Sequence, residues 1–275
     1  MRRFLLGSLL LPLIAFAEPT RVNGAPLKNA EVDVHVVEQK PVRDAGRFEL
    51  TVYPVVPQLN GVYTQHLGTM GQLTWHVREH FGFTLLGGGN WVNRESSFNA
   101  ELNNSARIEA QSAASLLWTW TALAGVEVAP FYGKFAIFDS GLAHFSVVIN
   151  AGAGMGGTRH QLKPAGMTPA TYGDTGVRFM GTVGAGFRLV LGEHVAIRLE
   201  VRDVVYTARV DRVNGCSSAD FAAFDLIDRS PGSGSCSVAS FENPTDIAIA
   251  RNLVRLPTSE VLNSLGAWAG VSFMY

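Results

Sequence analysis

The chain has 275 residues and a formal net charge of −1, so no global electrostatic field favours nucleic acid as a partner. Only 16% of the residues are charged, whereas a soluble domain normally carries about 25%. Apolar residues reach 47% but are spread over short segments, and no run beyond the N-terminus approaches the roughly 20 apolar residues of a spanning helix. This composition argues against a soluble enzyme and is typical of a membrane β-barrel.

The first residues read as an export signal. Arg2 and Arg3 precede an apolar run over residues 4–16, and Ala15 and Ala17 form a small-x-small cleavage site. We therefore predict that residues 1–17 are a signal peptide. The alternative, a membrane anchor, needs a longer apolar run than this one. The residue directly after the cleavage site, Glu18, is not a cysteine, which argues against a lipoprotein.

Residues 18–46 are predicted to be a separate periplasmic N-terminal segment. They are polar and contain three prolines, while Val32, Val34 and Val36 alternate with polar residues. Such alternation fits either a short strand or a plug.

From residue 47 to residue 275, eight segments alternate between apolar and polar side chains with a period of two. In one of them, one face carries apolar residues and the other carries charges: Val195, Ile197, Leu199 and Val201 against Arg198, Glu200 and Arg202. The segments exceed the roughly five or six residues usual for soluble strands, which argues against a β-sandwich. Because lipid offers no partner to an open sheet edge, a membrane sheet must close.

We therefore predict that residues 47–275 form an all-β fold, a closed antiparallel transmembrane β-barrel of about eight strands in an up-and-down meander. A ten-stranded barrel stays open as an alternative, because residues 134–138 also fit a strand. A soluble periplasmic barrel of the lipocalin kind is a further alternative, and it would be extracted without detergent.

The connections alternate in length, which predicts the orientation of the barrel. Long connections follow the third, fifth and seventh segments, near residues 93–116, 157–176 and 211–259, and shorter ones lie between them. Bacterial barrels place long loops outside and short turns in the periplasm. Both ends of the mature chain are therefore expected in the periplasm. The first outer loop, near residues 58–62, is an exception because it is short.

Aromatic residues gather near both ends of the predicted strands. Trp91, Trp118 and Trp120 are expected to face outward at the outer interface, in line with the aromatic belts of membrane proteins. Trp268 faces inward by its position in the alternation and is expected to fill space in the lumen.

Charges on the inward face are the most informative feature of the strands. The interior of an eight-stranded barrel is just filled by side chains, and buried charges must be paired or they cost several kcal/mol. We expect a salt-bridged plug that closes the lumen, with a narrow anion-preferring channel as the alternative. Asp203 faces lipid by strict alternation, so a bulge or the outer interface is expected there. The predicted lumen charges are Arg78, Glu127, Arg178, Arg188, Arg198, Glu200 and Arg202.

The last strand carries the sharpest motif. Gly270, Phe273 and Tyr275 match the signal by which the barrel-assembly machinery recognises its clients: a glycine followed by two outward hydrophobic residues, with an aromatic at the C-terminus. An apolar edge strand of this kind is recognised by strand addition. Trp268 occupies a position that is usually polar in this signal. The plain alternative is an ordinary final strand.

Cys216 and Cys236 are the only cysteines, and both lie in a stretch rich in glycine, serine and proline. Export permits a disulfide, and closing this loop would contribute about 3 kcal/mol in the chain-entropy model. Two free thiols are the alternative. No set of nearby ligands predicts a metal site.

Two further sequence patterns are formally compatible with cofactor binding or catalysis, but their surroundings do not support these functions. Residues 152–157 contain the glycine spacing of a dinucleotide-binding loop, but a proline-terminated loop follows instead of a helix, so no cofactor is predicted. His144 near Ser146, or His160 with Asp174, could serve an outer-membrane hydrolase, but no spacing enforces either arrangement. No catalytic residue is predicted.

Four fragments occur in a fixed order along the chain: residues 47–50, 132–135, 144–145 with 151–154, and 199–203. Their order and spacing resemble the outer membrane β-barrel domain family common in myxobacteria and their relatives. The resemblance covers roughly residues 31–275 and implies an outer-membrane barrel without known enzymatic residues. Some members of that family belong to envelope complexes for gliding motility.

Together these features predict a non-enzymatic barrel of the cell outer membrane that serves as a structural or interaction module. The alternatives are a narrow porin-like channel and, with less support, an outer-membrane hydrolase. Expected partners are outer-membrane lipid, the barrel-assembly machinery during insertion, and other envelope proteins, with no nucleic acid. Function concentrates on loops held by a rigid scaffold, so the loop that carries Cys216 and Cys236 is the expected recognition surface.

Overall fold

The structure is a computed structural model that describes residues 43–98, 116–137, 141–162, 171–226, 236, 238–242, 244–255 and 260–275. The predicted signal peptide and nearly all of the predicted N-terminal segment lie outside these residues.

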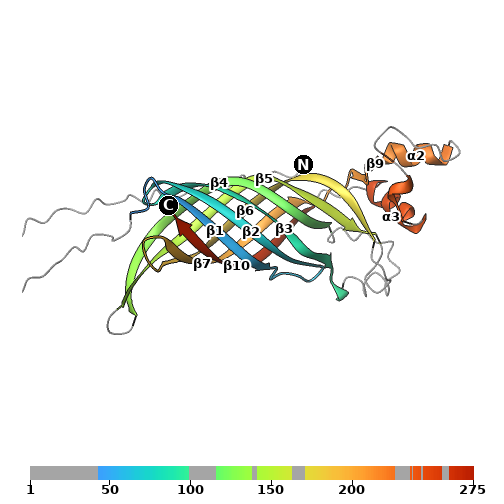
Figure 1. Cartoon of the computed structure of the whole chain (residues 1–275). Coiled ribbons are helices and arrows are strands. Elements are labelled where there is room, and N and C mark those ends of the chain that lie inside the picture. The colour runs from blue at the N-terminus through green and yellow to red at the C-terminus, as the bar shows by residue number, and fades with distance from the viewer. Residues whose placement is uncertain are drawn as a thin grey trace, which may run out of the picture. The chain divides into compact units, whose positions relative to one another are not determined.

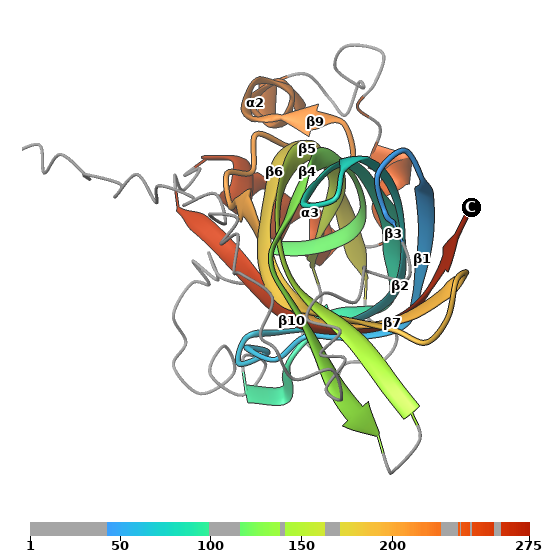
Figure 2. The ribbon, with the colours of Figure 1, turned by 90° about the vertical axis from the view of Figure 1, so that its left-hand side faces the viewer.

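Eight long strands form a closed antiparallel barrel, as predicted (Figure 1). Each strand pairs with the next barrel strand along the chain, and the ring closes where β1 pairs with β10, from Glu49 opposite Met274 to Val55 opposite Ala269. The view along the barrel shows the ring of strands (Figure 2). The strands are β1 (Phe48–Pro57), β2 (Thr64–Arg78), β3 (Phe81–Glu95), β4 (Leu116–Ile137), β5 (Gly141–Gln161), β6 (Tyr172–Val190), β7 (Val195–Thr207) and β10 (Val261–Met274).

The alternation in the sequence becomes the two faces of the wall. In β7, Leu199 is 56% exposed on the outside, whereas Arg198 and Glu200 are buried inside. The same contrast runs through the other strands, whose outward residues include many exposed large hydrophobic side chains. An apolar outer surface around a polar interior is the arrangement of a transmembrane barrel, because lipid replaces water on the outside. Within the described residues, no helix is long and apolar enough to cross a membrane.

Trp118 corrects one prediction. Trp91 and Trp120 are exposed on the outer wall as expected, but Trp118 is only 3% exposed. The ladder between β4 and β5 shifts between Trp118 and Trp120, which makes Thr119 an extra residue in the strand. Such a bulge reverses the alternation. Trp118 therefore turns inward and stacks on His66, with ring centroids 5.6 Å apart.

The hairpin of β4 and β5 corrects two further predictions, the connection at residues 130–142 and the ten-stranded alternative. Residues 130–142 were predicted to be a connection, but β4 continues to Ile137 and pairs with β5 down to Gly141. This two-stranded extension projects beyond the barrel at the end opposite the helices (Figure 1). Residues 134–137 thus belong to β4 and not to additional strands, so the ten-stranded alternative is wrong. At the other end, β5 and β6 also extend further into the predicted loop 157–176 than expected, to Gln161 and from Tyr172.

Asp203 lies in a regular part of the wall. It pairs with Val183 of β6 and with Leu265 of β10 without a shift of register, so the expected bulge is absent there. Its carboxylate lies 3.5 Å from the side-chain nitrogen of Asn263, which also faces outward. Asp203 is thus half-buried beside another polar side chain in the outer half of the wall.

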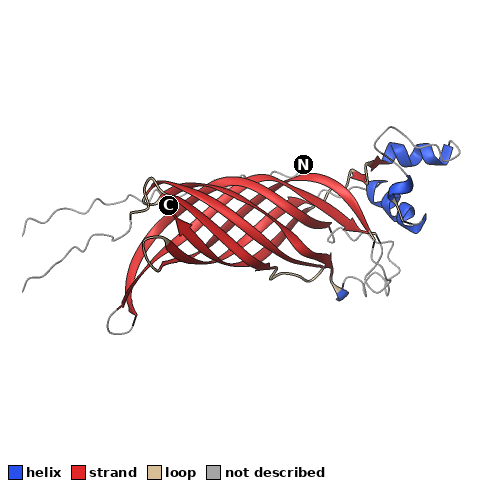
Figure 3. Ribbon diagram, viewed as in Figure 1, coloured by secondary structure: helices blue, strands red, loops and turns tan. Residues whose placement is uncertain are grey.

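The long connection between β7 and β10 carries a small helical subdomain, seen with the helices in blue in Figure 3. We call it the outer subdomain, because it lies at the end of the barrel with the long loops. Its described elements are β8 (Arg212–Val213), β9 (Cys216–Ser217), α2 (Ser218–Leu226), the 3-10 helix η2 (Val238–Ser240) and α3 (Pro244–Arg255).

Candidate functional site

Most of the predicted lumen charges do lie inside the barrel. Each of the following is at most 4% exposed, on the inward face of its strand: Glu127, Arg188, Arg198, Glu200 and Arg202. The prediction for Arg78 is wrong. The β2–β3 ladder shifts between His76 and Arg78, and Arg78 is exposed at the last position of β2.

Arg178 lies at the outer rim of the lumen. Its side chain is 13% exposed, and its guanidinium lies 3.2 Å from the carboxylate of Asp211, which follows β7. Arg209 also donates to Asp211 at 2.6 Å. The hydrogen bond from Arg209, followed by that from Arg178, holds the pKa of Asp211 below its usual value, although partial burial opposes this shift.

Arg198 is the centre of the buried charges. Its guanidinium, fully buried on β7, forms an ion pair with Glu127 of β4. The same group lies 3.4 Å from a carboxylate oxygen of Glu49 and 3.6 Å from one of Glu200. One cation thus faces three carboxylates from three different strands.

Arg202 and Glu200 form a second set of contacts toward the outer end. Arg202 lies 2.7 Å from Glu200 and donates to the side-chain oxygen of Gln72 at 2.6 Å. Tyr53 donates its hydroxyl to Glu200 at 2.7 Å, and Asn150 donates to the same carboxylate at 2.7 Å. Every group comes from the inward face of its strand, so the contacts join strands around the ring.

The end of the lumen opposite the outer subdomain holds a third set. Arg188 forms ion pairs with Glu49, at 2.9 Å, and with Asp44. Nε2 of His76 lies 2.7 Å from Oε2 of Glu49, the same carboxylate oxygen that Arg188 contacts. Asp44 belongs to the turn that precedes β1, and Glu79 receives hydrogen bonds from the backbone of this turn. The three sets together place three guanidiniums and four carboxylates inside the barrel, those of Arg188, Arg198 and Arg202 and those of Asp44, Glu49, Glu127 and Glu200.

Sequence reasoning missed two of these carboxylates. Glu49 could have been found, because Glu49, Thr51 and Tyr53 alternate with Phe48 and with the other outward residues of β1. Asp44 carries no such signal, because it lies in a turn before the first strand.

Aromatic side chains close the space above the charges. Trp268 is 2% exposed inside the lumen, as its position in the alternation predicted. Its ring meets Tyr53 edge to face, with centroids 5.2 Å apart, and the Arg202 guanidinium lies 5.0 Å from its centre. Toward the outer end, Met70 and Met180 continue the buried cluster. We call the buried charges and these covering side chains the lumen plug.

Glu49, His76 and Glu127 bring ligand atoms within 4.8 Å of one another, the spacing of a metal site. Both carboxylates, however, already bind guanidiniums: Glu49 binds Arg188 and Arg198, and Glu127 binds Arg198. These cations supply the charge that a metal ion would supply. The cluster fits an ion-pair network better than a metal centre.

The predicted alternatives for catalysis find little geometric support. His144 bonds through Nδ1 to the Tyr132 hydroxyl at 2.6 Å, and no hydrogen bond joins His144 to Ser146 in the described part of the chain. His160 pairs in register with Gly173, and its Nδ1 lies 2.8 Å from the carbonyl of Gln161. The glycine-rich residues 152–157 lie within β5, without the helix that a dinucleotide site requires.

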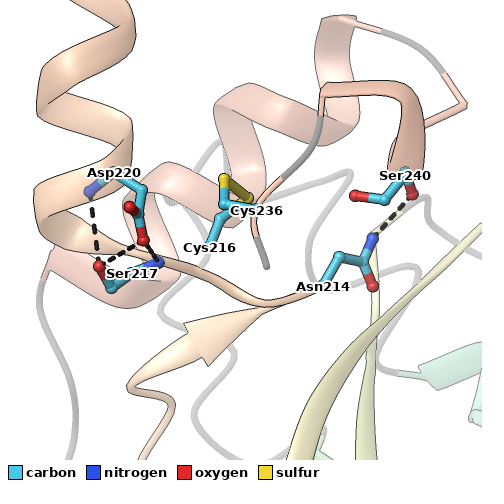
Figure 4. Close-up of a disulfide and its surroundings, with 6 residues drawn as sticks. All are labelled: Asn214, Cys216, Ser217, Asp220, Cys236 and Ser240. Carbon is cyan, nitrogen blue, oxygen red and sulfur yellow. Dashed lines mark hydrogen bonds between the residues drawn. A yellow bond between two sulfur atoms is a disulfide. The ribbon is translucent and has the colours of Figure 1, made fainter. Parts of the chain in front are cut away.

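Cys216 and Cys236 form a disulfide in the outer subdomain (Figure 4). Cys216 lies in β9 and is fully buried, and its partner is 3% exposed. Around the disulfide, Ser217 and Asp220 exchange hydrogen bonds at the start of α2, and Asn214 donates to the backbone of Ser240. The apolar side chains of the subdomain are buried and belong to the same cluster as the outer lumen residues of the barrel; they are Val213, Phe221, Phe241, Ala250 and Val254 with the two cysteines.

The predicted assembly signal lies on β10 with its aromatic residues on the outside. Phe273 is 41% exposed and Tyr275 is 72% exposed. Gly270 faces inward, where an added Cβ would lie 2.7 Å from the ring of Tyr53. Gly270 thus makes room for a side chain of the lumen plug, a structural role that is separate from its predicted role in the signal.

No family model matches the chain, and no curated protein shows significant sequence similarity to it. Three solved structures are similar to it in fold. The attachment invasion locus protein Ail of Yersinia pestis has 8% identity, a TM-score of 0.35 and coverage of 84% of this chain and 99% of its own. Neisserial surface protein A has 9% identity and a TM-score of 0.36, with coverage of 83% of this chain and 97% of its own. The outer membrane protein AlkL has 9% identity and a TM-score of 0.31, with coverage of 89% of this chain and 97% of its own. Likeness of this degree carries no argument about function.

Proposed function

We propose that the chain is a closed barrel of the outer membrane that acts as a non-enzymatic structural or interaction module of the envelope. The observation that carries this proposal is the lumen plug. Arg198 ties Glu127, Glu49 and Glu200 together at the centre, and Trp268 covers the charges. A lumen filled in this way leaves the loops as the surface on which recognition takes place.

The outer subdomain is the proposed recognition surface. Its disulfide and its buried apolar side chains hold helices α2 and α3 in a defined arrangement, which lowers the entropy that a partner would have to remove on binding. Another envelope protein is the proposed partner. The resemblance to the outer membrane β-barrel domain family suggests this choice, because some members of that family belong to envelope complexes for gliding motility. It rests on residues 47–50, 132–135, 144–145 with 151–154, and 199–203.

Affinity capture from detergent-solubilised outer membrane tests the proposal. The wild-type barrel and a Cys216→Ser/Cys236→Ser variant are compared after both have been shown to be folded by heat-modifiable mobility in gels. We expect one envelope protein to be retained by the wild type and lost from the variant. A variant in the lumen, Trp268→Phe, is the matched control and retains the partner. Equal retention by the disulfide variant would place recognition elsewhere on the molecule.

The location in the outer membrane is tested at the C-terminus. Removal of Tyr275 deletes the exposed aromatic at the end of β10 and should block insertion by the assembly machinery, while secretion continues. The control Tyr275→Phe keeps the aromatic ring and should insert normally. Normal heat-modifiable assembly of the truncated chain would contradict the assembly signal.

A narrow anion channel remains the competing function. Ions would have to pass between the guanidiniums of Arg188 and Arg198 and the carboxylate of Glu49 that joins them. Passage would require breaking buried ion pairs, which costs several kcal/mol for each uncompensated charge. The arrangement therefore favours the closed module.

A further inference from the structure

A groove lies on the outside of the barrel wall at its outer end. Its volume is about 660 Å³, and it runs between the short loop after β1 and the outward faces of β2 and β3. We call it the lateral groove. Half of its lining residues are apolar, namely Pro57, Leu59, Val62, Leu67 and Val92. The others are Gln58, Gly61, Gln65, His66 and Arg94.

The register of β2 and β3 gives the order of these residues along the wall. Gln65 pairs with Arg94, and the next outward pair toward the membrane centre is Leu67 with Val92. Trp91, which is 61% exposed, follows immediately at a shift of the ladder. With the outer-membrane location proposed above, on which this step rests, Trp91 settles at the membrane interface. That depth puts Arg94 at headgroup level and puts Leu67 and Val92 beside the first part of the acyl chains.

Arg94 is an exposed cation without an acidic partner among the described residues. Its Nε donates to the neutral side-chain oxygen of Gln65 at 3.1 Å. Two other arginines at this end of the barrel, Arg178 and Arg209, differ in this respect, because both bind Asp211. The guanidinium of Arg94 therefore keeps donors available for an anion, and a planar guanidinium matches the oxygens of a phosphate.

The loop after β1 supplies the opposite wall of the lateral groove. Leu59 and Val62 are 54% and 55% exposed there, and the backbone of the loop is fixed by hydrogen bonds. Leu59 donates its backbone N–H to Leu265 at 2.7 Å, and the Asn60 side chain accepts from the N–H of the same residue at 2.9 Å. The apolar walls are thus held apart by a braced loop, which favours a groove that exists before its ligand binds.

We propose that the lateral groove binds a phosphorylated lipid of the outer leaflet, with Arg94 at the phosphate and the side chains of Leu59, Val62, Leu67 and Val92 along the first part of an acyl chain. The positive charge of Arg94 and its position at headgroup level favour this occupant. The groove opens to lipid, and its one cation lies at the depth of the headgroups. A free phosphate would use only Arg94 and would leave the apolar walls without a role.

Native mass spectrometry of the full-length barrel in a neutral detergent tests the proposal. The probes are didecanoyl phosphatidic acid and the chain-matched didecanoylglycerol, which lacks the phosphate. We expect the wild type to retain phosphatidic acid more tightly. Arg94→Gln should weaken that binding about fivefold, the effect of one basic side chain at a membrane surface. Arg212→Gln, which removes one exposed arginine from the outer subdomain, is the matched control and leaves binding unchanged.

Two further measurements separate the sources of affinity. Excess inorganic phosphate should not displace the lipid, and Leu67→Ser/Val92→Ser should weaken binding of both probes. Displacement by inorganic phosphate would show a simple anion site and overturn the proposal. Equal binding of the two probes, or equal loss in Arg94→Gln and Arg212→Gln, would also overturn it. Heat-modifiable mobility of each variant verifies that the barrel is folded.

Discussion

Arg198 of β7 and Glu127 of β4 form an ion pair across the interior of the barrel, between two strands that are separated in the wall by β5 and β6. Both side chains are buried, and Arg198 also faces Glu49 and Glu200. The pair therefore connects distant parts of the ring through the lumen plug. Its loss would leave buried carboxylates without the positive charge that compensates them.

Replacement of Arg198 by leucine should destabilise the barrel strongly. The change leaves three buried carboxylates with less positive charge, and breaking a buried pair on one side typically costs about 3–5 kcal/mol. Urea titration of the barrel in detergent micelles, followed by heat-modifiable mobility, measures the loss. The double variant Arg198→Leu/Glu127→Leu should lose less stability than the sum of the losses in Arg198→Leu and Glu127→Leu, with a coupling energy of about 0.5–3 kcal/mol. Additive effects would show that the two residues do not depend on each other.

Substitutions at Gly186 and Gly87 test how tightly the wall of the barrel is packed, because one site is crowded and the other is open. A Cβ at Gly186 would lie 2.3 Å from the carbonyl of Leu199 and 2.5 Å from Cγ of Glu200, so the neighbouring strand and a residue of the lumen plug must move. We expect Gly186→Ala to cost about 1–3 kcal/mol. At Gly87 the nearest atom is 3.7 Å away, so Gly87→Ala should stay within about 0.5 kcal/mol. Equal urea midpoints of unfolding for Gly186→Ala and Gly87→Ala would contradict the close packing around Gly186.

Reduction of the disulfide should loosen the outer subdomain and leave the barrel intact. Cys216 and Cys236 are 20 residues apart, and closing a loop of this length stabilises by about 3 kcal/mol in the chain-entropy model. Limited proteolysis with and without reductant measures the effect. We expect cleavage within residues 212–255 after reduction, whereas the heat-modifiable mobility of the barrel does not change. Faster unfolding of the whole barrel on reduction would show that the two parts are coupled.

Asp211 predicts a pH dependence at the outer rim. Hydrogen bonds from Arg209 and Arg178 lower its pKa below the usual value of 3.8. Because the pKa of Asp211 is lowered in the folded state, the contribution of its carboxylate to folding stability is fully present above pH 3.8. This contribution is lost as the pH falls through the lowered pKa. NMR titration of the arginine side chains should therefore show a midpoint below 3.8, and Asp211→Asn should abolish it. A midpoint at or above that value would contradict the contact.

The wall of the barrel could be predicted from the sequence in some detail, because a strand with one face in lipid must alternate. That rule assigns Arg198, Glu200 and Arg202 to the inward face of their strand, and the structure places all three inside the barrel. The same rule, applied to β1, would also have found Glu49. Alternation is a local property, so it can be read from a single strand.

What escaped prediction depends on contacts between strands. The bulge at Thr119 turns Trp118 inward, and a bulge is defined by the register of two strands and not by the residues of one. The same holds for Arg78, which follows a shift at the end of β2. Asp44 reaches the lumen from a turn whose position depends on Glu79, in another part of the chain. Such pairings leave no pattern in the local sequence.

Conductance of the purified full-length barrel in planar lipid bilayers tests the central claim, the closed lumen, most directly. Because Arg188, Arg198 and Trp268 fill the interior, we predict a flat current trace for the wild type after insertion has been verified. Trp268→Ala/Arg198→Ala, which removes two of these side chains, should produce openings if the variant inserts. Discrete openings of the wild type that change when Arg188 or Arg198 is replaced would contradict the closed barrel and establish a channel.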